Sequence, residues 1–434
     1  FLALIGDVQY FYMRLFHALS AQRTLRAFND SSFRALWTAN LLIYSSRWIQ
    51  VTVLGWFVLD KTDSPLLIAL VGFFGWAPVF ALSLFGGVLA DAFNRKVIII
   101  STQVLAFITA FSMAVLIMTG QDEFWHAYPV IMVTGLVWSL DMPSRRSAIY
   151  DLLGMSGVTN GVALDSGGMS ASRVIGPALG GFLTVLVGFS GAYIVVCVFY
   201  FFAIILVSRV NILSREFDNN FQFTILNDLK TGLVYVATNR VILGVVLTTM
   251  VMNLFMFPFV YLVPIIARDV LGVGVSLMGI LQSFTGIGSL LGAVIVASIV
   301  DIKYHGRIFL LGSLVSIIAL VLFSFSDWYL VSLLFLLILG FGHSGFSTMQ
   351  STTVMLMSRS DIRGKALGVV NLAIGSQPFG ALLIGALAER FGPAFAITIQ
   401  ASVAGICIIL VMVSLPALWG RFPVDRSQER FTIG

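Results

Sequence analysis

Long apolar stretches, separated by short polar gaps, make up most of this 434-residue chain. A helix needs about 20 mainly apolar residues to cross the hydrocarbon core of a bilayer, and twelve stretches come close to or exceed that length. Because lipid offers the backbone no hydrogen-bond partners, a spanning stretch must be helical. The pattern predicts an all-α integral membrane protein with twelve transmembrane helices, at residues 35–59, 66–90, 97–119, 126–143, 160–187, 191–210, 241–267, 275–300, 307–326, 328–357, 365–388 and 392–415.

The composition agrees with a membrane protein, since 59% of the residues are hydrophobic and 10% are charged. A soluble chain of this length could not keep so much apolar surface from water. The two cysteines, Cys197 and Cys407, fall within spans and have no disulfide or metal-ligand spacing. No phosphate-binding loop, HExxH motif or nucleophile elbow occurs. We therefore expect no cofactor, no metal and no enzymatic activity.

Basic residues lie almost entirely on one side of the predicted membrane. That side receives 20 of the 25 Lys and Arg residues, the other receives Lys61, Arg268 and Arg390, and Arg47 and Arg173 lie inside spans. Positively charged loops stay cytoplasmic. We therefore expect a multi-pass protein of the plasma membrane, the inner membrane of a bacterium, with both termini in the cytoplasm. Anionic membrane lipid accounts for the net charge of +5, without a nucleic-acid partner.

The longest basic gap separates the spans into two sets of six. We predict a cytoplasmic amphipathic segment at 1–34, a six-helix bundle at 35–210, a cytoplasmic linker at 211–240, a second six-helix bundle at 241–415 and a cytoplasmic tail at 416–434. A plain tail is the alternative for residues 1–34. Within the linker, Ile225, Leu229 and Leu233 have the spacing of a short amphipathic helix.

The two sets of spans share motifs at matching positions. Gly176-Pro177-Ala178-Leu179-Gly180-Gly181 in the fifth span corresponds to Pro378-Phe379-Gly380-Ala381-Leu382 in the eleventh, and Asp91 after the second corresponds to Asp301 after the eighth. Paired six-span repeats are typical of transporters that move about a central site. Chance similarity between apolar helices is the alternative.

Five stretches resemble motifs of the major facilitator superfamily, and within it the enterobactin exporters and macrolide efflux pumps of the drug:proton antiporter branch. They are Gly87-Val-Leu-Ala-Asp91-Ala-Phe-Asn-Arg95-Lys96, Asp141-Met-Pro143-Ser-Arg145, Arg173-Val-Ile-Gly176-Pro177-Ala-Leu-Gly180-Gly181, Pro264-Ile-Ile-Ala-Arg268-Asp269-Val-Leu, and Arg363-Gly364 leading to Pro378 and Gly385. The resemblance covers residues 30–415. It implies the major facilitator fold, with two six-helix pseudo-repeats.

The resemblance also implies a cytoplasmic gate, in which the loop after the second span holds the two halves together. The gate residues here would be Asp91, Arg95, Lys96, Arg145, Asp301 and Arg363. A carboxylate such as Asp91 can stabilise a nearby helix N-terminus. Ala92 and Asn94 depart from the family's basic residue and glycine, so we expect a weaker gate. The alternative is a charge cluster that only sets topology.

The fifth span carries a helix-packing motif of small residues and proline, Gly176, Pro177, Gly180 and Gly181. Such residues remove a backbone hydrogen bond and let helices approach closely. In the resembling family the motif marks exporters and antiporters more than importers. Ordinary small-residue packing is a compatible alternative.

Several polar residues should share one level of the membrane. At a rise of roughly 1.5 Å per residue, Arg47 and Arg173 lie roughly 18–20 Å deep, and an arginine there is costly unless it has a function. The predicted substrate-binding residues are Arg47, Trp48, Arg173, Asn253, His343 and Gln377. We expect a wet cavity in which the arginines meet an anionic or carbonyl-rich substrate. The alternative is that they bond helix carbonyls or reach Asp165.

Proton coupling would need a group that titrates while the site alternates. The candidates are Asp165, Asp141 and His343. Asp141 and Arg145 are one turn apart, so an interfacial salt bridge is the alternative for Asp141. His343 could equally be a packing residue.

Three functions follow as hypotheses. The first is secondary active export of a small amphipathic, anionic or carbonyl-rich compound, siderophore-like or drug-like, by alternating access and in exchange for protons. The second is a lysolipid or lipid flippase of the same fold. The third is a non-transporting subunit or assembly factor of a larger membrane complex. For the first two we expect a monomer whose partners are its small-molecule substrate and membrane lipids.

Overall fold

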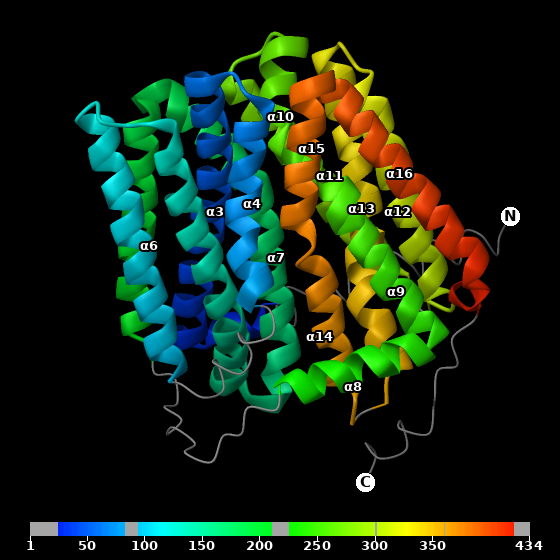
Figure 1. Ribbon diagram of the computed structural model, residues 1–434. Helices are drawn as coiled ribbons and strands as arrows, with labels where there is room; N and C mark the ends of the chain where they lie inside the picture. The colour runs from blue at the N-terminus through cyan, green and yellow to red at the C-terminus, as the bar shows by residue number, and fades with distance from the viewer. Residues whose placement is uncertain (1–24, 83–93, 211–224, 300–301, 360, 421–434) are drawn as a thin grey trace, which may run out of the picture. The chain divides into compact units, whose positions relative to one another are not determined.

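The computed structural model describes residues 25–82, 94–210, 225–299, 302–359 and 361–420, whose regular structure is entirely helical (Figure 1). Within these residues the chain forms two compact units. Unit 1 contains 25–61, 94–210 and 275–283, and unit 2 contains 62–82, 225–274, 284–299, 302–359 and 361–420. Each unit thus includes one segment from the other half of the sequence. The six-helix bundles predicted at 35–210 and 241–415 stay a prediction.

Unit 1 is built around α7, which is a run of helical segments rather than one continuous helix. Gly154 (φ 64°) and Gly188 (φ 71°) interrupt α7 with backbone angles that favour glycine. The elements of the unit are η1 (Arg26–Asn29), α3 (Ser31–Thr62), α6 (Arg95–Met118), η2 (Phe124–His126), α7 (Ala127–Ser208) and the first residues of α11 (Val275–Ser298).

Unit 2 contains more and shorter helices. The region between α9 and α11 is built from π-helical and 3₁₀ turns. The elements are α4 (Pro65–Leu82), α8 (Ile225–Thr238), α9 (Arg240–Val251), η3 (Met252–Met256), η4 (Phe257–Tyr261), α10 (Val263–Ile265), η5 (Ile266–Val270), the remainder of α11, α12 (His305–Ser324), α13 (Tyr329–Met357), α14 (Arg363–Ile374), α15 (Gln377–Phe391), α16 (Pro393–Ser414) and η6 (Pro416–Trp419).

The described residues contain ten helices that are long and apolar enough to cross a membrane. The segment made of η2 and α7 counts as one of these ten helices, although Gly154 and Gly188 interrupt it. An all-α membrane fold is therefore confirmed. The number of twelve spans stays a prediction.

Asparagines begin two of the spanning helices. The Asn94 side chain accepts from the backbone N–H groups of Lys96 and Val97, at the start of α6. Asn239 does the same at the start of α9. An N-cap oxygen satisfies donors that have no partner within the helix, so these polar residues fix where each helix begins.

Small residues set the closest helix contacts in unit 1. A Cβ on Gly176 would lie 2.4 Å from Trp48 Cβ on α3, and one on Gly180 would lie 3.2 Å from the Ile49 carbonyl oxygen. A Cβ on Gly279 of α11 would lie 2.3 Å from the Pro177 carbonyl oxygen. The middle of α7 therefore approaches α3 and the first part of α11 almost backbone to backbone.

Candidate substrate-binding and coupling site

A buried ion pair lies at the centre of a polar network in unit 1. Arg145, fully buried on α7, donates through Nε to Asp141 one turn earlier. Asp141 also accepts from Thr102 Oγ1 and Gln103 Nε2, both at 3.3 Å and both on α6. Buried charge pairs need such additional hydrogen bonds to offset desolvation. The pair between Asp141 and Arg145, which the sequence offered as an interfacial salt bridge and the alternative to proton coupling at Asp141, is buried within the unit.

The second carboxylate of this network is Asp165, farther along α7 and also buried. Asn40 Nδ2 on α3 donates to Asp165 Oδ1 at 2.6 Å, and Tyr44 Oη donates to Asp165 Oδ2 at 3.1 Å. Arg145 donates to the Asn40 side-chain oxygen. Asn40 therefore links Asp165 to the Asp141–Arg145 pair. α3, α6 and α7 meet in this network.

The network has one more acidic group than basic groups. Asp141 and Asp165 face a single guanidinium, that of Arg145, and Asp165 receives hydrogen bonds from an amide and a hydroxyl. The groups that contact Asp165 are therefore hydrogen-bond donors and not oxygen ligands of the kind that bind a metal ion. Within the described residues, no group of three His, Cys, Asp or Glu could hold a metal ion.

The two predicted mid-membrane arginines both lie in unit 1, each over an indole ring. Arg47 Cζ lies 4.3 Å from the ring centre of Trp138, and Arg173 Cζ lies 5.4 Å from that of Trp48. In the described residues Arg173 has no hydrogen-bond or ion-pair partner, and its Nε is buried. Asp165, eight residues earlier, bonds Asn40 and Tyr44 instead. Indole faces attract cations but leave the guanidinium edge for an acceptor.

Sequence reasoning missed the polar residues of α3 that support the site. Gln50 Nε2 donates to Tyr200 Oη at 2.9 Å, and Thr52 Oγ1 donates to Gln282 Oε1 of α11 at 2.7 Å. Asn40 and Tyr44, earlier on the same helix, were missed too. A polar residue at every third or fourth position of one apolar span was the available signal.

The other predicted binding residues lie in unit 2. Asn253, buried on η3, donates to the Thr249 carbonyl oxygen at 2.9 Å, and Gln350 donates to Thr249 Oγ1 at 2.8 Å. Gln377 is buried at the start of α15. His343 lies with its ring centre 5.1 Å from that of Phe257, an aromatic packing contact. The predicted binding residues of unit 1 thus include charged side chains, whereas those of unit 2 are two amides, Asn253 and Gln377, and the imidazole of His343.

Two predicted gate residues, Asp91 and Asp301, lie outside the described residues. Arg95 forms an ion pair with Asp151, and Lys96 Nζ donates to the Ser208 carbonyl oxygen at 2.8 Å, both within unit 1. Arg145 belongs to the buried network. Arg363 is exposed at the start of α14 in unit 2. The proposed gate contact stays a prediction.

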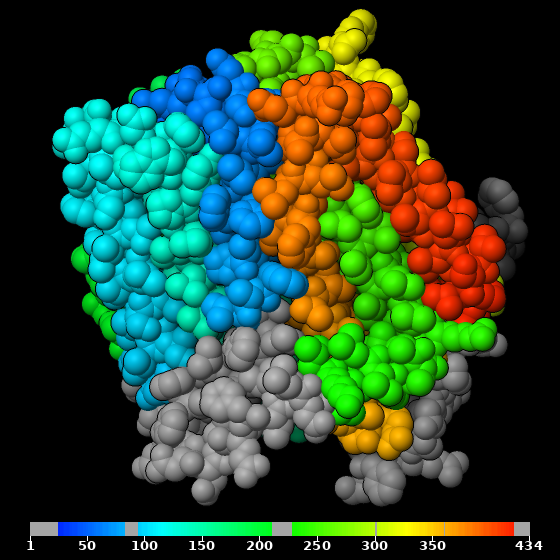
Figure 2. Space-filling model, in the orientation of Figure 1, coloured from blue at the N-terminus to red at the C-terminus, as the bar shows by residue number. Residues whose placement is uncertain are grey.

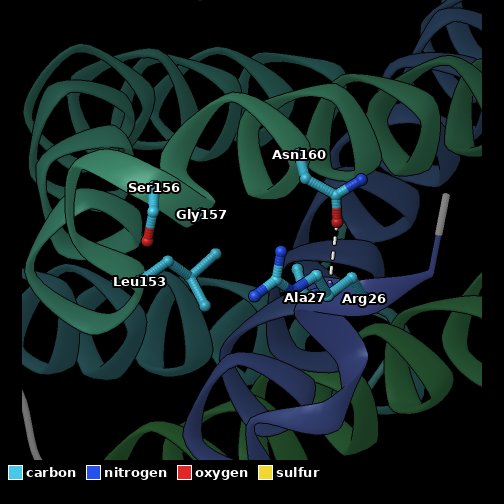
Figure 3. Close-up of a pocket in the computed structure, with 6 residues that line it drawn as sticks. All are labelled: Arg26, Ala27, Leu153, Ser156, Gly157 and Asn160. Atoms are coloured by element: carbon cyan, nitrogen blue, oxygen red, sulfur yellow. Dashed lines mark hydrogen bonds between the residues drawn. The ribbon is translucent and has the colours of Figure 1, made fainter. Parts of the chain in front are cut away.

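A surface pocket of ≈530 Å³ lies elsewhere in unit 1, beside η1 and the Gly154 break of α7 (Figure 3). Asn160 Oδ1 accepts from the Ala27 backbone N–H at 2.9 Å across its floor. The lining residues are Arg26, Ala27, Leu153, Ser156, Gly157 and Asn160. The pocket includes none of the predicted binding residues.

Comparison with known proteins agrees with this architecture. A family profile described as "Transmembrane secretion effector", of the MFS type, matches residues 22–425. The staphyloferrin A transporter of Staphylococcus aureus is 22% identical over 386 residues, which cover 86% of this chain and 94% of that protein. The MFS-type transporter YfiS of Bacillus subtilis is 24% identical over 383 residues, covering 82% and 85%.

Solved transporters share the fold at low identity. An inward-facing, unoccupied bacterial homologue of the human lysosomal transporter Spinster aligns with a TM-score of 0.66 and 15% identity, covering 89% of this chain and 96% of its own. A peptide transporter, POT, in complex with sulfate aligns with a TM-score of 0.72 and 12% identity, covering 90% and 95%. At these identities the likeness concerns the fold alone.

Proposed function

Because the chain belongs to the transmembrane secretion effector family of the major facilitator superfamily, we propose that it exports a small amphipathic compound by alternating access. Its relatives are transporters, and it is a multi-pass secondary transporter rather than an enzyme. The proposed cargo carries anionic or carbonyl groups and is siderophore-like or drug-like. The staphyloferrin A transporter among its relatives supports the siderophore class.

The observation that carries this proposal is the environment of Arg173. A guanidinium in a spanning helix costs roughly 2.5–3.5 kcal/mol by insertion scales. Within the described residues the Arg173 guanidinium lies over the Trp48 ring, its buried Nε has no hydrogen-bond partner, and Asp165 is bonded to Asn40 and Tyr44. An acidic or carbonyl group of a substrate would supply the missing acceptors. Arg47 over Trp138 offers a second guanidinium in the same unit.

A binding screen tests the cargo class. Thermal unfolding in detergent is followed with anionic siderophores, macrolides and lysolipids, on the unaltered protein and on Arg47→Ala, Arg173→Ala and the control Lys303→Ala, an exposed residue of unit 2. We expect an anionic compound to raise the melting temperature, and the rise to disappear in the two arginine variants only. Equal stabilisation of all four proteins would contradict the site. Stabilisation by lysolipids alone would favour a flippase.

We propose that transport is coupled to protons and that Asp165 carries the exchanged proton. Its network holds two carboxylates and one guanidinium, so it contains one more acidic than basic group. Asp141 has its own cation, and His343 packs against Phe257. In proteoliposomes, Asp165→Asn should abolish uptake driven by a pH gradient while leaving substrate exchange intact. Unchanged gradient-driven uptake would exclude Asp165.

We further propose that the basic ends of the helices face the cytoplasm of a bacterial cell and that the chain acts as a monomer. The arrangement of basic gaps supports this orientation. This proposal also includes the wet cavity and the cytoplasmic gate that the sequence predicts. The gate residues are Asp91, Arg95, Lys96, Arg145, Asp301 and Arg363.

A further inference from the structure

The linker helix α8 (Ile225–Thr238) has no role in the proposed transport chemistry, yet it holds a defined place on unit 2. It runs across the ends of α9 and α14 instead of alongside them (Figure 1). Asn239 alone separates α8 from Arg240, the first residue of the spanning helix that contains α9. α8 therefore lies within one residue of the point at which the chain enters the membrane.

One face of α8 is held tightly against α14. A Cβ on Gly232 would lie 2.8 Å from the Lys365 carbonyl oxygen, so the two backbones are in direct contact. Lys365 Nζ pairs with Asp228 at 2.9 Å. Tyr235 Oη accepts from the Arg359 backbone N–H at 3.3 Å. A displacement of α8 would therefore displace the start of α14 with it.

The opposite face of α8 is exposed and mostly apolar. Lys230, Leu233, Val234 and Ala237 recur at the spacing of one helical face, and all four are exposed. Leu233 is 44% and Val234 57% exposed. Figure 2 shows one side of α8 at the surface of unit 2. The outer face of a helix that faces water is usually polar, so two adjacent large aliphatic side chains there are unusual.

The surface around this face is basic. Lys230 lies on this face of α8, Arg240 begins α9 and Arg363 begins α14, whereas Asp228 and Lys365 pair with each other on the opposite, packed face. A narrow apolar stripe bordered by Lys and Arg is typical of helices in the membrane interface. Basic residues beside an anionic leaflet are attracted to its surface charge.

We propose that α8 binds the membrane interface as an anionic-lipid sensor. Leu233 and Val234 enter the acyl boundary, Lys230 and Arg240 bind phosphate headgroups, and the Gly232 and Asp228 contacts transmit the position of α8 to α14. A protein partner fits less well, because a standard interface buries about 800 Å² on each side, more than a stripe of four residues offers. The inference does not depend on what the protein transports.

The depth of Val234 tests the proposal. The full chain, with Cys197→Ala and Cys407→Ala, carries a nitroxide at Val234→Cys, at the lipid reference Val294→Cys on the exposed surface of α11, or at the aqueous reference Asp361→Cys. Collision rates with oxygen and with a water-soluble nickel chelate are measured in phosphatidylcholine vesicles with and without phosphatidylglycerol. Thermal unfolding verifies that each variant is folded.

We expect the oxygen-to-nickel ratio at Val234 to exceed that at Asp361 several-fold and to rise further with phosphatidylglycerol. Lys230→Gln with Arg240→Gln should remove that rise, whereas Lys303→Gln should not. A ratio at Val234 equal to that at Asp361 would place α8 in water and overturn the proposal. Protection from both reagents would mean that a protein covers the helix. Indifference to phosphatidylglycerol would exclude anionic-lipid sensing.

Discussion

Asn40 links two charged groups because its amide has both a donor and an acceptor end. The donor end faces Asp165 and the acceptor end faces Arg145. The sequence drew attention to Asp141, Arg145 and Asp165 because charges are rare in spans. It did not single out Asn40, since an amide in a span has many possible partners and only the crossing of α3 and α7 selects among them.

Asn40→Ala should destabilise the protein by about 2–4 kcal/mol, because it removes hydrogen bonds to two buried charged groups. Denaturant-induced unfolding in detergent measures the change. Asn371→Ala, at an exposed amide on α14, is the matched control and should change stability by less than about 0.5 kcal/mol. Equal effects of the two substitutions would contradict the network.

Removing one partner of the Asp141–Arg145 pair should cost more than removing both. Asp141→Asn or Arg145→Gln alone leaves a buried charge and should destabilise by about 3–5 kcal/mol. The double variant should cost clearly less than the sum of the two. A double-mutant cycle of unfolding free energies measures this coupling, and strict additivity would show that the two groups do not interact.

At the scale of the elements, glycines decide how closely α7 and α11 approach and where α7 breaks. Gly176 and Gly180 were predicted as packing residues from their spacing, and they do lie against α3. Gly279 attracted no attention in the sequence, because a single glycine in an apolar span has no pattern. Its role follows from the Pro177 carbonyl oxygen, which only the folded chain brings beside it.

Gly279→Ala should destabilise by about 1–3 kcal/mol, the usual cost of overpacking a tight contact. Its new methyl would meet the Pro177 carbonyl oxygen at 2.3 Å. Gly405→Ala, whose methyl would meet only Ile317 Cγ2 at 3.5 Å, should be neutral or stabilising. Thermal unfolding of both variants in one detergent compares them, and a tolerated Gly279→Ala would refute the close approach.

Gly154→Ala tests a different property, backbone strain without a steric clash. A Cβ there would meet nothing within 4 Å, but φ is +64° and ψ is −174°, a region almost confined to glycine. The substitution should cost about 1–3 kcal/mol. Gly364→Ala, equally open but without a positive φ, should have little effect. Unfolding measurements that find both variants unchanged would argue against the break in α7.

At the scale of the whole molecule, the number of spans and their orientation set the direction of transport. Membrane-impermeant maleimide labelling of single cysteines in intact cells measures both. Gln121→Cys and Trp328→Cys should react from outside, and Thr238→Cys and Arg359→Cys should react only after the cells are opened, because basic loops stay cytoplasmic. The reverse labelling pattern would mean that the protein has the opposite orientation in the membrane. A mixed pattern would contradict the prediction of twelve transmembrane helices.

The helical membrane class was determined by the sequence alone, because the length of an apolar run and the lack of hydrogen-bond partners in lipid are local properties. So was the rarity of charge inside the spans, which identified Arg47, Arg173, Asp141 and Asp165 without any structure. The compact units were not readable from the order of the spans. Residues 62–82 and 275–283 each join helices from the other half of the chain.

The partners of the charged groups were decided only by the tertiary structure. Asp165 and Arg173 lie eight residues apart on α7 and could have paired. α3 instead places Asn40 and Tyr44 against Asp165, and Trp48 beneath Arg173. Helix periodicity tells which residues share a face, but which helix meets that face depends on contacts between residues more than a hundred positions apart. In the described part of the chain, those contacts leave Arg173 over the Trp48 ring and without an acidic partner.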